Sequence, residues 1–300
     1  MGVAPAKGLA SSAWLSLGVG HKTMISGKTE IIAHIGFPTH AFKAPMIYNP
    51  YFDQAGIDAV VVPMGCKAED YPAFLKAVFS LTNLRGALIT MPHKVTTVGL
   101  VDGLSATAKI AGACNAVRRN ADGRLIGDMF DGEGFVRGVQ RKGLQLTGIR
   151  ALVVGCGGVG SAIAASLAAA GVGTLQLFDA YTPSMEGLAT RLREHYPALR
   201  VETGSNDPAG CDLVANATPM GMEDGDPLPM DVDRIASTTF VGEVVMKSEM
   251  TAFLRAAVAR GCPVQVGSDM LFEQIPAYLE FFGLPTTTPE VLRAVATLKY

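Results

Sequence analysis

Three glycines carry the most specific chemical pattern in this sequence. Gly155, Gly157 and Gly160 form a G-x-G-x-x-G motif in ALVVGCGGVGSAIAASLAAAG, directly after an apolar strand and at the start of an alanine-rich helix. The first glycine allows a tight turn, the second lets a pyrophosphate approach the backbone, and the third lets helix and strand pack closely. The helix start, with Gly158 and Val159, offers free N–H groups and a partial positive charge to phosphates. The motif predicts dinucleotide binding, with a purely structural glycine turn as the alternative.

An aspartate closes the next predicted strand. Asp179 ends the segment TLQLFD, 19 residues after Gly160. A carboxylate there accepts hydrogen bonds from the 2′- and 3′-hydroxyls of a ribose and repels a 2′-phosphate. The residues that follow, AYTPSM, contain no arginine to hold such a phosphate. This favours NAD as the cofactor, with NADP as a second possibility. A solvated aspartate at a strand end is the structural alternative.

Polar residues also follow apolar runs in the first half of the chain. Thr90 and Lys94 lie in GALITMPHK, Asn115 lies in GACNAV, and Asp131 lies in GDMFDGEGF. Each has a structural explanation when taken singly, because polar residues are common where helices and strands end. Lys94 could be a solvated lysine at a helix start, Asp131 an N-cap, and Asn115 a partner of the backbone. Their types alone therefore do not assign a site.

Short apolar runs alternate with helical patterns from residue 30 to residue 128. This alternation is typical of βαβ units and predicts a mostly parallel sheet. The segment NADGR joins two strands as a hairpin, which predicts an antiparallel edge. The predicted strands cover residues 30–35, 58–64, 86–90, 114–119 and 124–128, and the predicted helices cover about 45–55, 68–80, 93–99 and 105–111.

A second set of elements begins at Asp131. A helix over DGEGFVRGVQRKGL precedes RALVVG, a continuous apolar strand of the kind that is buried on both faces. Strands and helices then alternate as far as PVQVG, and the remaining segments, DMLFEQIPAYLEFFG and PEVLRAVATL, are helical in pattern. A length of 300 residues suits about two domains. We therefore expect an α/β protein with a mixed sheet in one domain and a Rossmann-like parallel sheet in the other.

Composition argues against several classes of protein. Hydrophobic residues make up 49% and charged residues 17%, which allows a sizeable core. The net charge of -2 gives no footprint for nucleic acid or an anionic membrane. The five cysteines form no C-x-x-C pair, so we expect no disulfide framework and no metal site, but buried reduced thiols in a cytoplasmic protein. Residues 1–23 look like an N-terminal extension without signal-peptide features, and no run reaches the ~18 apolar residues of a membrane helix.

Six short motifs, in order, make the sequence resemble the shikimate dehydrogenase family. That family has G-x-N-V-T-x-P-H-K, G-A-x-N-T and G-x-N-T-D-x-x-G-F, followed by a GxGGxxxA cofactor loop, I-N-A-T-P-x-G-M and G-x-x-M-L-x-x-Q. This chain has GALITMPHK, GACNAV, GDMFDGEGF, GCGGVGSA, ANATPMGM and GSDMLFEQ. The match covers residues 24 to 285.

The resemblance implies two domains with the active site in the cleft between them. The substrate domain would comprise residues 24–129 and 268–300, and the cofactor domain residues 130–267. Lys94 and Asp131 would be the catalytic pair. The other implied roles are binding of ring hydroxyls by Thr90 and Asn115, substrate binding by Gln274, and cofactor binding by Asn216, Ala217, Thr218, Pro219, Met220 and Gly267.

The chemistry of alcohol oxidation agrees with such a pair. It needs a hydride acceptor and a group that takes the hydroxyl proton. A lysine must be neutral to act as a base, yet a neighbouring Asp131 favours its charged form. The coupled pair therefore matters more than either residue, and Lys94 would act chiefly as a proton donor in the reducing direction.

The sequence departs from the family at the loop that would hold a substrate carboxylate. The family reads H-S-x-S-P, whereas this chain reads AFKAP, so Phe42 and Ala44 replace two serines and Lys43 lies between them. Met246 also replaces an expected tyrosine, and Glu243 an aspartate. We therefore expect an NAD(P)-dependent dehydrogenase of the shikimate/quinate type whose substrate is not plain shikimate.

Several alternatives stay open. Phe42 would offer an apolar wall, while Lys43 would bind a carboxylate if it points inward. If Lys43 points outward, the substrate would be a less polar cyclic alcohol or ketone. A non-catalytic or regulatory protein that binds NAD(P) and a small ligand is the alternative function. We expect a small-molecule substrate as the partner, and a monomer or a homodimer.

Overall fold

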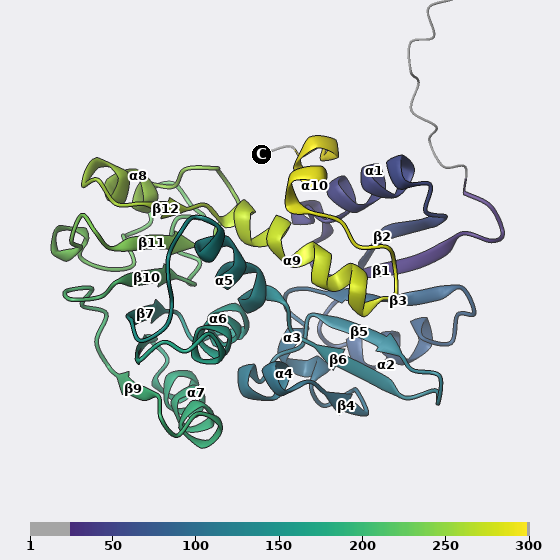
Figure 1. Cartoon of the computed structure of the whole chain (residues 1–300). Helices are drawn as coiled ribbons and strands as arrows, with labels where there is room; N and C mark the ends of the chain where they lie inside the picture. The colour runs from purple at the N-terminus through teal and green to yellow at the C-terminus, as the bar shows by residue number, and fades with distance from the viewer. Residues whose placement is uncertain (1–24, 299–300) are drawn as a thin grey trace, which may run out of the picture.

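Two six-stranded sheets lie side by side, with helices packed around each (Figure 1). The structure is a computed structural model, and it describes residues 25–298. The extension predicted over residues 1–23 lies outside the described residues. The predicted α/β class, with one mixed and one parallel sheet, is confirmed.

The first sheet has the strand order β2-β1-β3-β5-β6-β4. Strands β1, β2 and β3 are parallel, whereas β5 runs antiparallel to β3 and to β6. The predicted hairpin at NADGR is the β5–β6 connection. The elements of this half are β1 (Glu30–Gly36), η1 (Thr39–Ala41), α1 (Pro45–Ala55), β2 (Ala59–Gly65), α2 (Tyr71–Val78), β3 (Leu84–Ile89), α3 (Lys94–Thr97), β4 (Gly103–Leu104), α4 (Ala106–Ala111), β5 (Ala116–Arg119) and β6 (Leu125–Asp128).

Strand β1 is buried on both faces, and alternate residues meet different partners. Ala33 and Ile35 pack in a cluster with α2, whereas Ile32 packs in a cluster with α1 and α9. Side chains two apart on a strand share a face, so His34 lies on the face of Ile32. His34 is therefore a polar side chain on the α1 and α9 side of the sheet.

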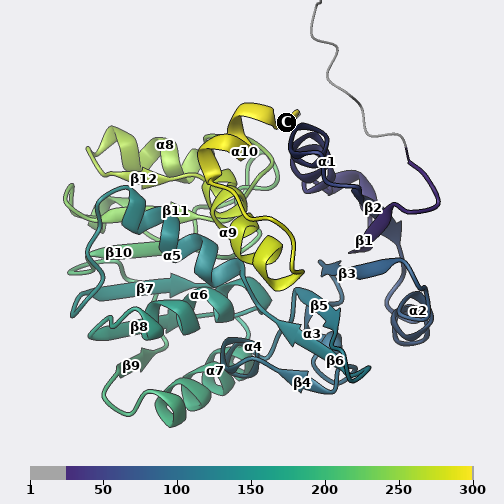
Figure 2. The same cartoon turned by 45° about the vertical axis from the view of Figure 1, so that its right-hand side comes forward.

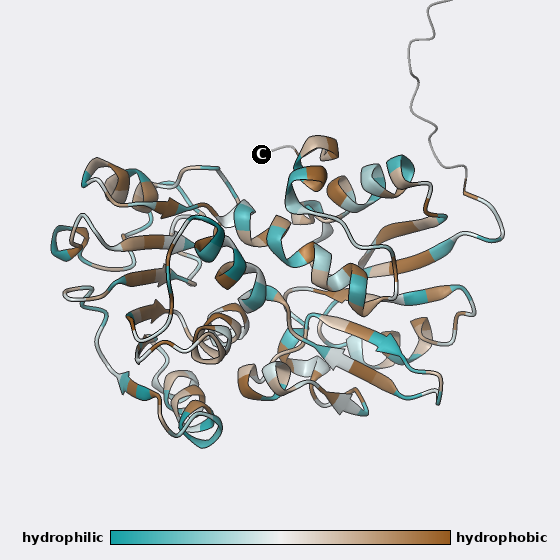
Figure 3. Cartoon of the chain, viewed as in Figure 1, coloured by the Kyte–Doolittle hydropathy of each residue, from teal (hydrophilic) through white to brown (hydrophobic). Residues whose placement is uncertain are grey.

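The second sheet is entirely parallel, with the order β12-β11-β10-β7-β8-β9. This is the doubly wound arrangement in which a ligand binds where the strand order reverses, beside β7 and β10. Figure 3 shows the central strands mostly in the hydrophobic colour, as expected for strands covered on both faces. The elements here are β7 (Arg150–Val154), α6 (Gly158–Ala169), β8 (Thr174–Phe178), α7 (Thr182–His195), β9 (Arg200–Thr203), β10 (Leu213–Asn216), η2 (Val232–Arg234), β11 (Phe240–Glu243), α8 (Ala252–Ala259) and β12 (Val264–Gln265).

Two helices pack on each other between the sheets, α5 (Asp131–Arg141) and α9 (Gly267–Phe281) (Figures 1 and 2). Arg141 on α5 forms an ion pair with Glu273 on α9 at 2.5 Å. The chain continues to α10 (Pro289–Val295), where Arg293 reaches back to Asp269 at 2.5 Å. The domain boundaries at residues 129/130 and 267/268 stay predictions.

The main differences from the predicted elements concern short segments. Helix α3 spans residues 94–97 and α2 spans residues 71–78, so both are shorter than predicted. Strands β4 and β9 were not predicted, because they have two and four residues and little apolar character.

All five cysteines are buried free thiols. None of the helices within residues 25–298 combines the length and the apolar character needed to cross a bilayer.

Candidate active site

Lys94, Asn115 and Asp131 converge on one carboxylate. Nζ of Lys94 donates to Oδ2 of Asp131, and Nδ2 of Asn115 donates to Oδ1 at 2.8 Å. The side chains of Lys94 and Asp131 are 13% and 5% exposed, so this ion pair is sheltered from water. The three residues that sequence analysis placed separately therefore form one hydrogen-bonded group.

Local structure explains why Lys94 is held there. His93 is fully buried, its ring stacks on Tyr71 at 3.9 Å, and its Nε2 lies 2.8 Å from the carbonyl oxygen of Cys66. Helix α3 begins at the next residue, Lys94, whose carbonyl oxygen accepts from the backbone of Cys114 at 2.8 Å. These contacts fix the loop after β3 beside the segment that carries Asn115.

Asp131 is the first residue of α5, not its N-cap. The N-cap is Phe130, which makes no side-chain capping bond. The backbone N–H of Phe130 instead donates to Oδ1 of Asn115 at 3.0 Å. Asn115 thus holds both the helix start and the carboxylate, which corrects the structural alternative of Asp131 as a cap.

The loop after β1 brings Phe42 over the end of that strand. The Phe42 ring stacks on His34, with centroids 4.1 Å apart. A Cβ built on Gly36 would lie 3.0 Å from Cζ of Phe42 and 2.3 Å from Cγ2 of Thr90. Phe42 and Thr90 therefore pack closely beside Gly36 at the carboxyl end of the sheet. Lys43 is half-buried, and both alternatives for its side chain stay predictions.

Three buried polar atoms on this side of the sheet have no hydrogen-bond partner among the described residues. They are Nδ1 of His34, the hydroxyl of Tyr48 and Oε1 of Gln274. Tyr278 lies one helical turn after Gln274 on α9. Burial raises the pKa of Tyr278, and the charges of Asp131 and Tyr48 act in the same direction.

The glycine loop has the geometry of a phosphate site. Gly155 has φ +98°, and a Cβ built on Gly160 would lie 1.8 Å from the carbonyl oxygen of Gly155. A Cβ on Gly157, the N-cap of α6, would meet no atom within 4 Å in the described part of the chain. Two glycines are thus required by the fold, whereas Gly157 leaves space that a bound pyrophosphate would use. Gly158 faces Lys94, because its built Cβ would be 3.8 Å from Cβ of that lysine.

Asp179 lies against this loop. Its Oδ2 accepts from the backbone of Cys156 at 2.6 Å, and its Oδ1 accepts from the backbone of Tyr181 at 2.7 Å. Each carboxylate oxygen can accept a further hydrogen bond. Asp179 is therefore held at the mouth of the glycine loop with capacity left for ribose hydroxyls.

The segment after β10 folds on the side chain of Asn216. Its Oδ1 accepts from N and Oγ1 of Thr218, at 3.1 and 2.6 Å, and its Nδ2 donates to the carbonyl oxygen of Met220 at 3.1 Å. Ala217 adjoins the glycine loop, since a Cβ on Gly155 would lie 2.8 Å from its carbonyl oxygen. The predicted cofactor segment Asn216–Met220, which includes Pro219, is thus beside the phosphate loop.

A buried carboxyl adjoins that segment. Glu243 pairs in register with Asn216 on the neighbouring strand, and its Oε2 accepts from Oγ1 of Thr251 at 2.9 Å. Burial raises the pKa of Glu243 to about 7.

Gly267, which was predicted to bind the cofactor, is the first residue of α9. It is packed so closely that a Cβ would lie 2.1 Å from the carbonyl oxygen of Val245.

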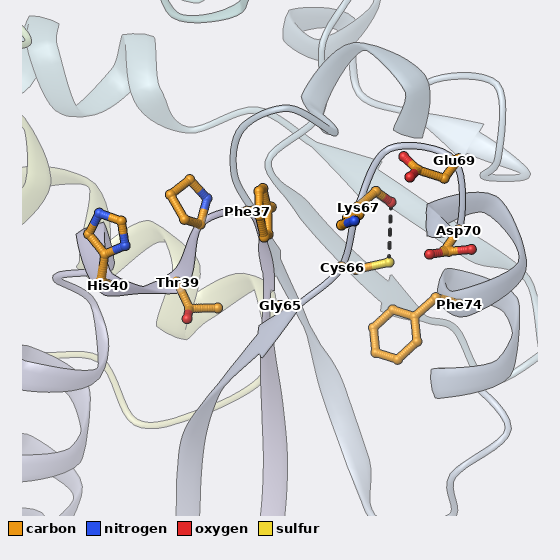
Figure 4. Close-up of a pocket in the computed structure, with 10 residues that line it drawn as sticks. Phe37, Thr39, His40, Gly65, Cys66, Lys67, Glu69, Asp70 and Phe74 are labelled. Carbon is orange, nitrogen blue, oxygen red and sulfur yellow. Dashed lines mark hydrogen bonds between the residues drawn. The ribbon is translucent and has the colours of Figure 1, made fainter.

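A groove of about 680 Å³ lies between the loops that follow β1 and β2 of the first sheet. Figure 4 shows Phe37 and Thr39 on one loop facing Lys67 and Cys66 on the other. None of the residues predicted for catalysis or cofactor binding lines this groove.

Comparison with known proteins assigns the family. The model of the shikimate dehydrogenase substrate binding domain matches residues 35–117, and that of the ThiF family matches residues 136–192. Shikimate dehydrogenase (NADP(+)) of Rubrobacter xylanophilus is 36% identical over 281 residues, which is 91% of this chain and 97% of that protein. The chain belongs to the shikimate dehydrogenase family. It is an NAD(P)-dependent oxidoreductase that acts on a CH–OH group.

Solved structures of shikimate dehydrogenase relatives share the whole fold. Shikimate 5-dehydrogenase from Listeria monocytogenes, in complex with shikimate and NAD, is 25% identical with a TM-score of 0.83, covering 90% of this chain and 97% of that one. Quinate dehydrogenase from Corynebacterium glutamicum, in complex with NAD, is 29% identical with a TM-score of 0.79, covering 89% and 98%. The predicted resemblance is confirmed.

His34, Tyr48 and Tyr278 were not among the site residues predicted from the sequence. A histidine inside the apolar strand EIIAHI was an available signal, because alternation places it on a definite face. The tyrosines gave no such signal, since an aromatic residue in an amphipathic helix is usually part of the core. Both tyrosines pack in the apolar cluster of α1 and α9, and only this packing brings Tyr278 under the influence of the Asp131 charge.

Proposed function

We propose that the protein transfers a hydride between NAD and a secondary alcohol, or the corresponding ketone, of a substrate other than plain shikimate. The observation that supports this best is the group formed by Lys94, Asp131 and Asn115, next to the start of α6. A bound nicotinamide supplies or accepts the hydride. The protein must then orient the alcohol and move one proton.

Lys94 is the residue that moves the proton. In the reducing direction, its ammonium group donates a proton to the carbonyl oxygen as that oxygen gains negative charge. Asp131 holds the ammonium group in place, and Asn115 fixes the carboxylate. In the oxidising direction the same lysine takes the hydroxyl proton. Thr90, which packs beside Gly36 at the carboxyl end of the first sheet, and Gln274 on α9 bind hydroxyl groups of the substrate.

The proposed cofactor is NAD. Asp179 is anchored against the glycine loop by Cys156 and Tyr181, and its charge disfavours a 2′-phosphate. The Rubrobacter relative is named for NADP, whereas the Listeria and Corynebacterium structures contain NAD, so both cofactors occur among the relatives. The local charge at Asp179 supports NAD for this chain.

The proposed departure from shikimate rests on the loop after β1. Phe42 and Ala44 stand where the family has two serines, and the Phe42 ring is packed on His34. Met246 packs against the same apolar cluster as Ala44. A charged carboxylate loses about 1.5–3 kcal/mol for each missing hydrogen bond. Shikimate is therefore expected to be a poor substrate.

The test is steady-state reduction of NAD and NADP with shikimate, quinate and related cyclic alcohols. We expect NAD to give the higher kcat/KM, and Lys94→Ala to lower turnover about 100-fold or more without changing the Kd for NAD. Lys67→Ala, an exposed lysine on the loop after β2, is the matched control. A Lys94→Ala variant that retains turnover within a few-fold would contradict the proposal.

A further inference from the structure

We propose that His34 is a specificity-determining residue which, together with Phe42, fits the substrate pocket to an uncharged, hydroxyl-rich compound, a polyol or its ketone, rather than to a carboxylate. This inference rests on the proposed dehydrogenase function and names its substrate class. It concerns the end of the pocket formed by β1, the loop after it and α1.

His34 lies next to the position where the family has its first carboxylate-binding serine. It is 7% exposed, and the Phe42 ring covers it at 4.1 Å with 28° between the ring planes. Phe42 occupies the position of the first carboxylate-binding serine of the family. The phenyl ring of Phe42 is larger than a serine side chain, so it fills space beside Gly36 and Thr90 that a serine would leave open.

The imidazole is neutral. Burial lowers the pKa of His34 to about 3, and the charge of Lys94 acts in the same direction. A neutral ring nitrogen can donate to or accept from a hydroxyl, depending on its tautomer. It gives a carboxylate no opposite charge. The positive charge of Lys94, which acts on His34, is already balanced by the carboxylate of Asp131 in their ion pair.

The other unpartnered polar atoms on this side of the sheet are also uncharged. In the part of the chain that the structure describes, Nδ1 of His34, the Tyr48 hydroxyl and Oε1 of Gln274 are buried without a hydrogen-bond partner. Such burial is unfavourable unless a ligand or water completes the bonds. Ala44, four residues before Tyr48 on the same helix, adds no donor. Hydroxyl groups, which both donate and accept, match this set better than an anion does.

The experiment compares neutral and anionic probes with NAD as cofactor. The neutral probes are myo-inositol and sorbitol, and the anionic probes are shikimate and quinate. We expect the best neutral probe to have at least 10-fold higher kcat/KM than either acid. His34→Val should raise the KM of that probe about 10-fold with kcat within about 3-fold, because it removes a contact made equally in ground and transition states.

Two further variants separate a hydrogen bond from packing. His34→Asn keeps a polar group near the position of Nδ1 and should recover much of the lost affinity, whereas His34→Leu should not. His40→Val is the matched control. His40 is an exposed histidine on the loop that carries Phe42, and it lines the groove of Figure 4. Restoring serines at Phe42 and Ala44 should shift the preference toward shikimate.

The outcomes are distinct. A higher kcat/KM for shikimate or quinate, or an unchanged KM in His34→Val, would overturn this inference and leave the dehydrogenase function intact. Loss of carboxylate turnover in Lys43→Ala would show that Lys43 holds an acid, and would overturn it as well. Absence of NAD reduction with every probe would overturn the proposed function and this inference together.

Discussion

Asn115 holds Asp131 from two sides. Its Nδ2 donates to the carboxylate at 2.8 Å, while its Oδ1 accepts from the backbone N–H of the residue before Asp131 at 3.0 Å. The amide thus sets both the direction of the carboxylate and the start of α5. We therefore expect Asn115 to act by positioning the proposed catalytic carboxylate as well as by binding substrate.

Asn115→Ala should therefore impair turnover without removing either catalytic residue. We expect kcat to fall about 10- to 100-fold, because Asp131 loses the donor that orients it toward Lys94. Asn115→Asp, which keeps the shape but places a second carboxylate against Asp131, should be worse. Stopped-flow measurement of NADH formation, with NAD affinity measured in parallel, checks this. Equal kcat for wild type and Asn115→Ala would contradict the role.

The glycine loop offers a matched pair of substitutions. A Cβ on Gly157 meets nothing within 4 Å among the described residues, whereas a Cβ on Gly160 would lie 1.8 Å from a backbone oxygen. Gly160→Ala should lower the free energy of unfolding by about 1–3 kcal/mol through overpacking. Gly157→Ala should leave stability unchanged but weaken NAD binding about 10-fold or more, because the methyl group occupies the phosphate position. Urea unfolding and titration with NAD separate the two effects, and the reverse pattern would contradict the assignment.

Asp179 should control the choice between the two nicotinamide cofactors. Asp179→Ala should raise the Kd for NAD about 10-fold and reduce the difference between the Kd values for NAD and NADP. Both the acceptor for the ribose hydroxyls and the charge that repels a 2′-phosphate are lost. Asp179→Asn keeps one acceptor and should affect NAD less than Asp179→Ala does. Fluorescence titration with each cofactor measures this. Tighter binding of NADP than of NAD by the wild-type protein would show that the assignment is wrong.

Glu243 should make stability depend on pH. Its pKa is raised from 4.5 to about 7 by burial, so its contribution to the free energy of unfolding is fully present below pH 4.5 and is lost as pH rises through 7. Glu243→Gln should remove that loss, and its stability relative to wild type should rise by about 2–3 kcal/mol between pH 5 and pH 8. Urea unfolding at both values tests this, with Glu249→Gln as the exposed control. Parallel pH profiles for wild type and Glu243→Gln would refute it.

Local patterns in the sequence predicted those parts of the fold that depend on residues close together in the chain. The glycine loop, the apolar strands and the NADGR hairpin each carry their signal within about ten residues. Strand β9 carries none, because RVET is a short edge strand in which no residue is fully buried. Its place at the edge of the sheet depends on β8, which is more than 20 residues earlier.

The site was predictable only as far as ordered motifs allowed. Lys94 and Asp131 are 37 residues apart in sequence, and no local pattern brings them together. The place of His34 beside Phe42 required the loop after β1 to fold back on its own strand. A one-dimensional pattern describes a strand's two faces, but it does not say which distant helix covers each face.

The place of α9 after both sheets in the sequence affects the order in which the parts of the protein can fold during synthesis. One face of the first sheet, with Ile32 and Leu88, is covered by Ile275 and Leu279 of α9 and by Leu292 of α10. A ribosome synthesises those covering residues after both sheets, long after the strands that they cover have emerged. That apolar face is therefore only partly covered, by α1, and open to chaperones and to other nascent chains until the second sheet has been made and α9 and α10 pack against the first.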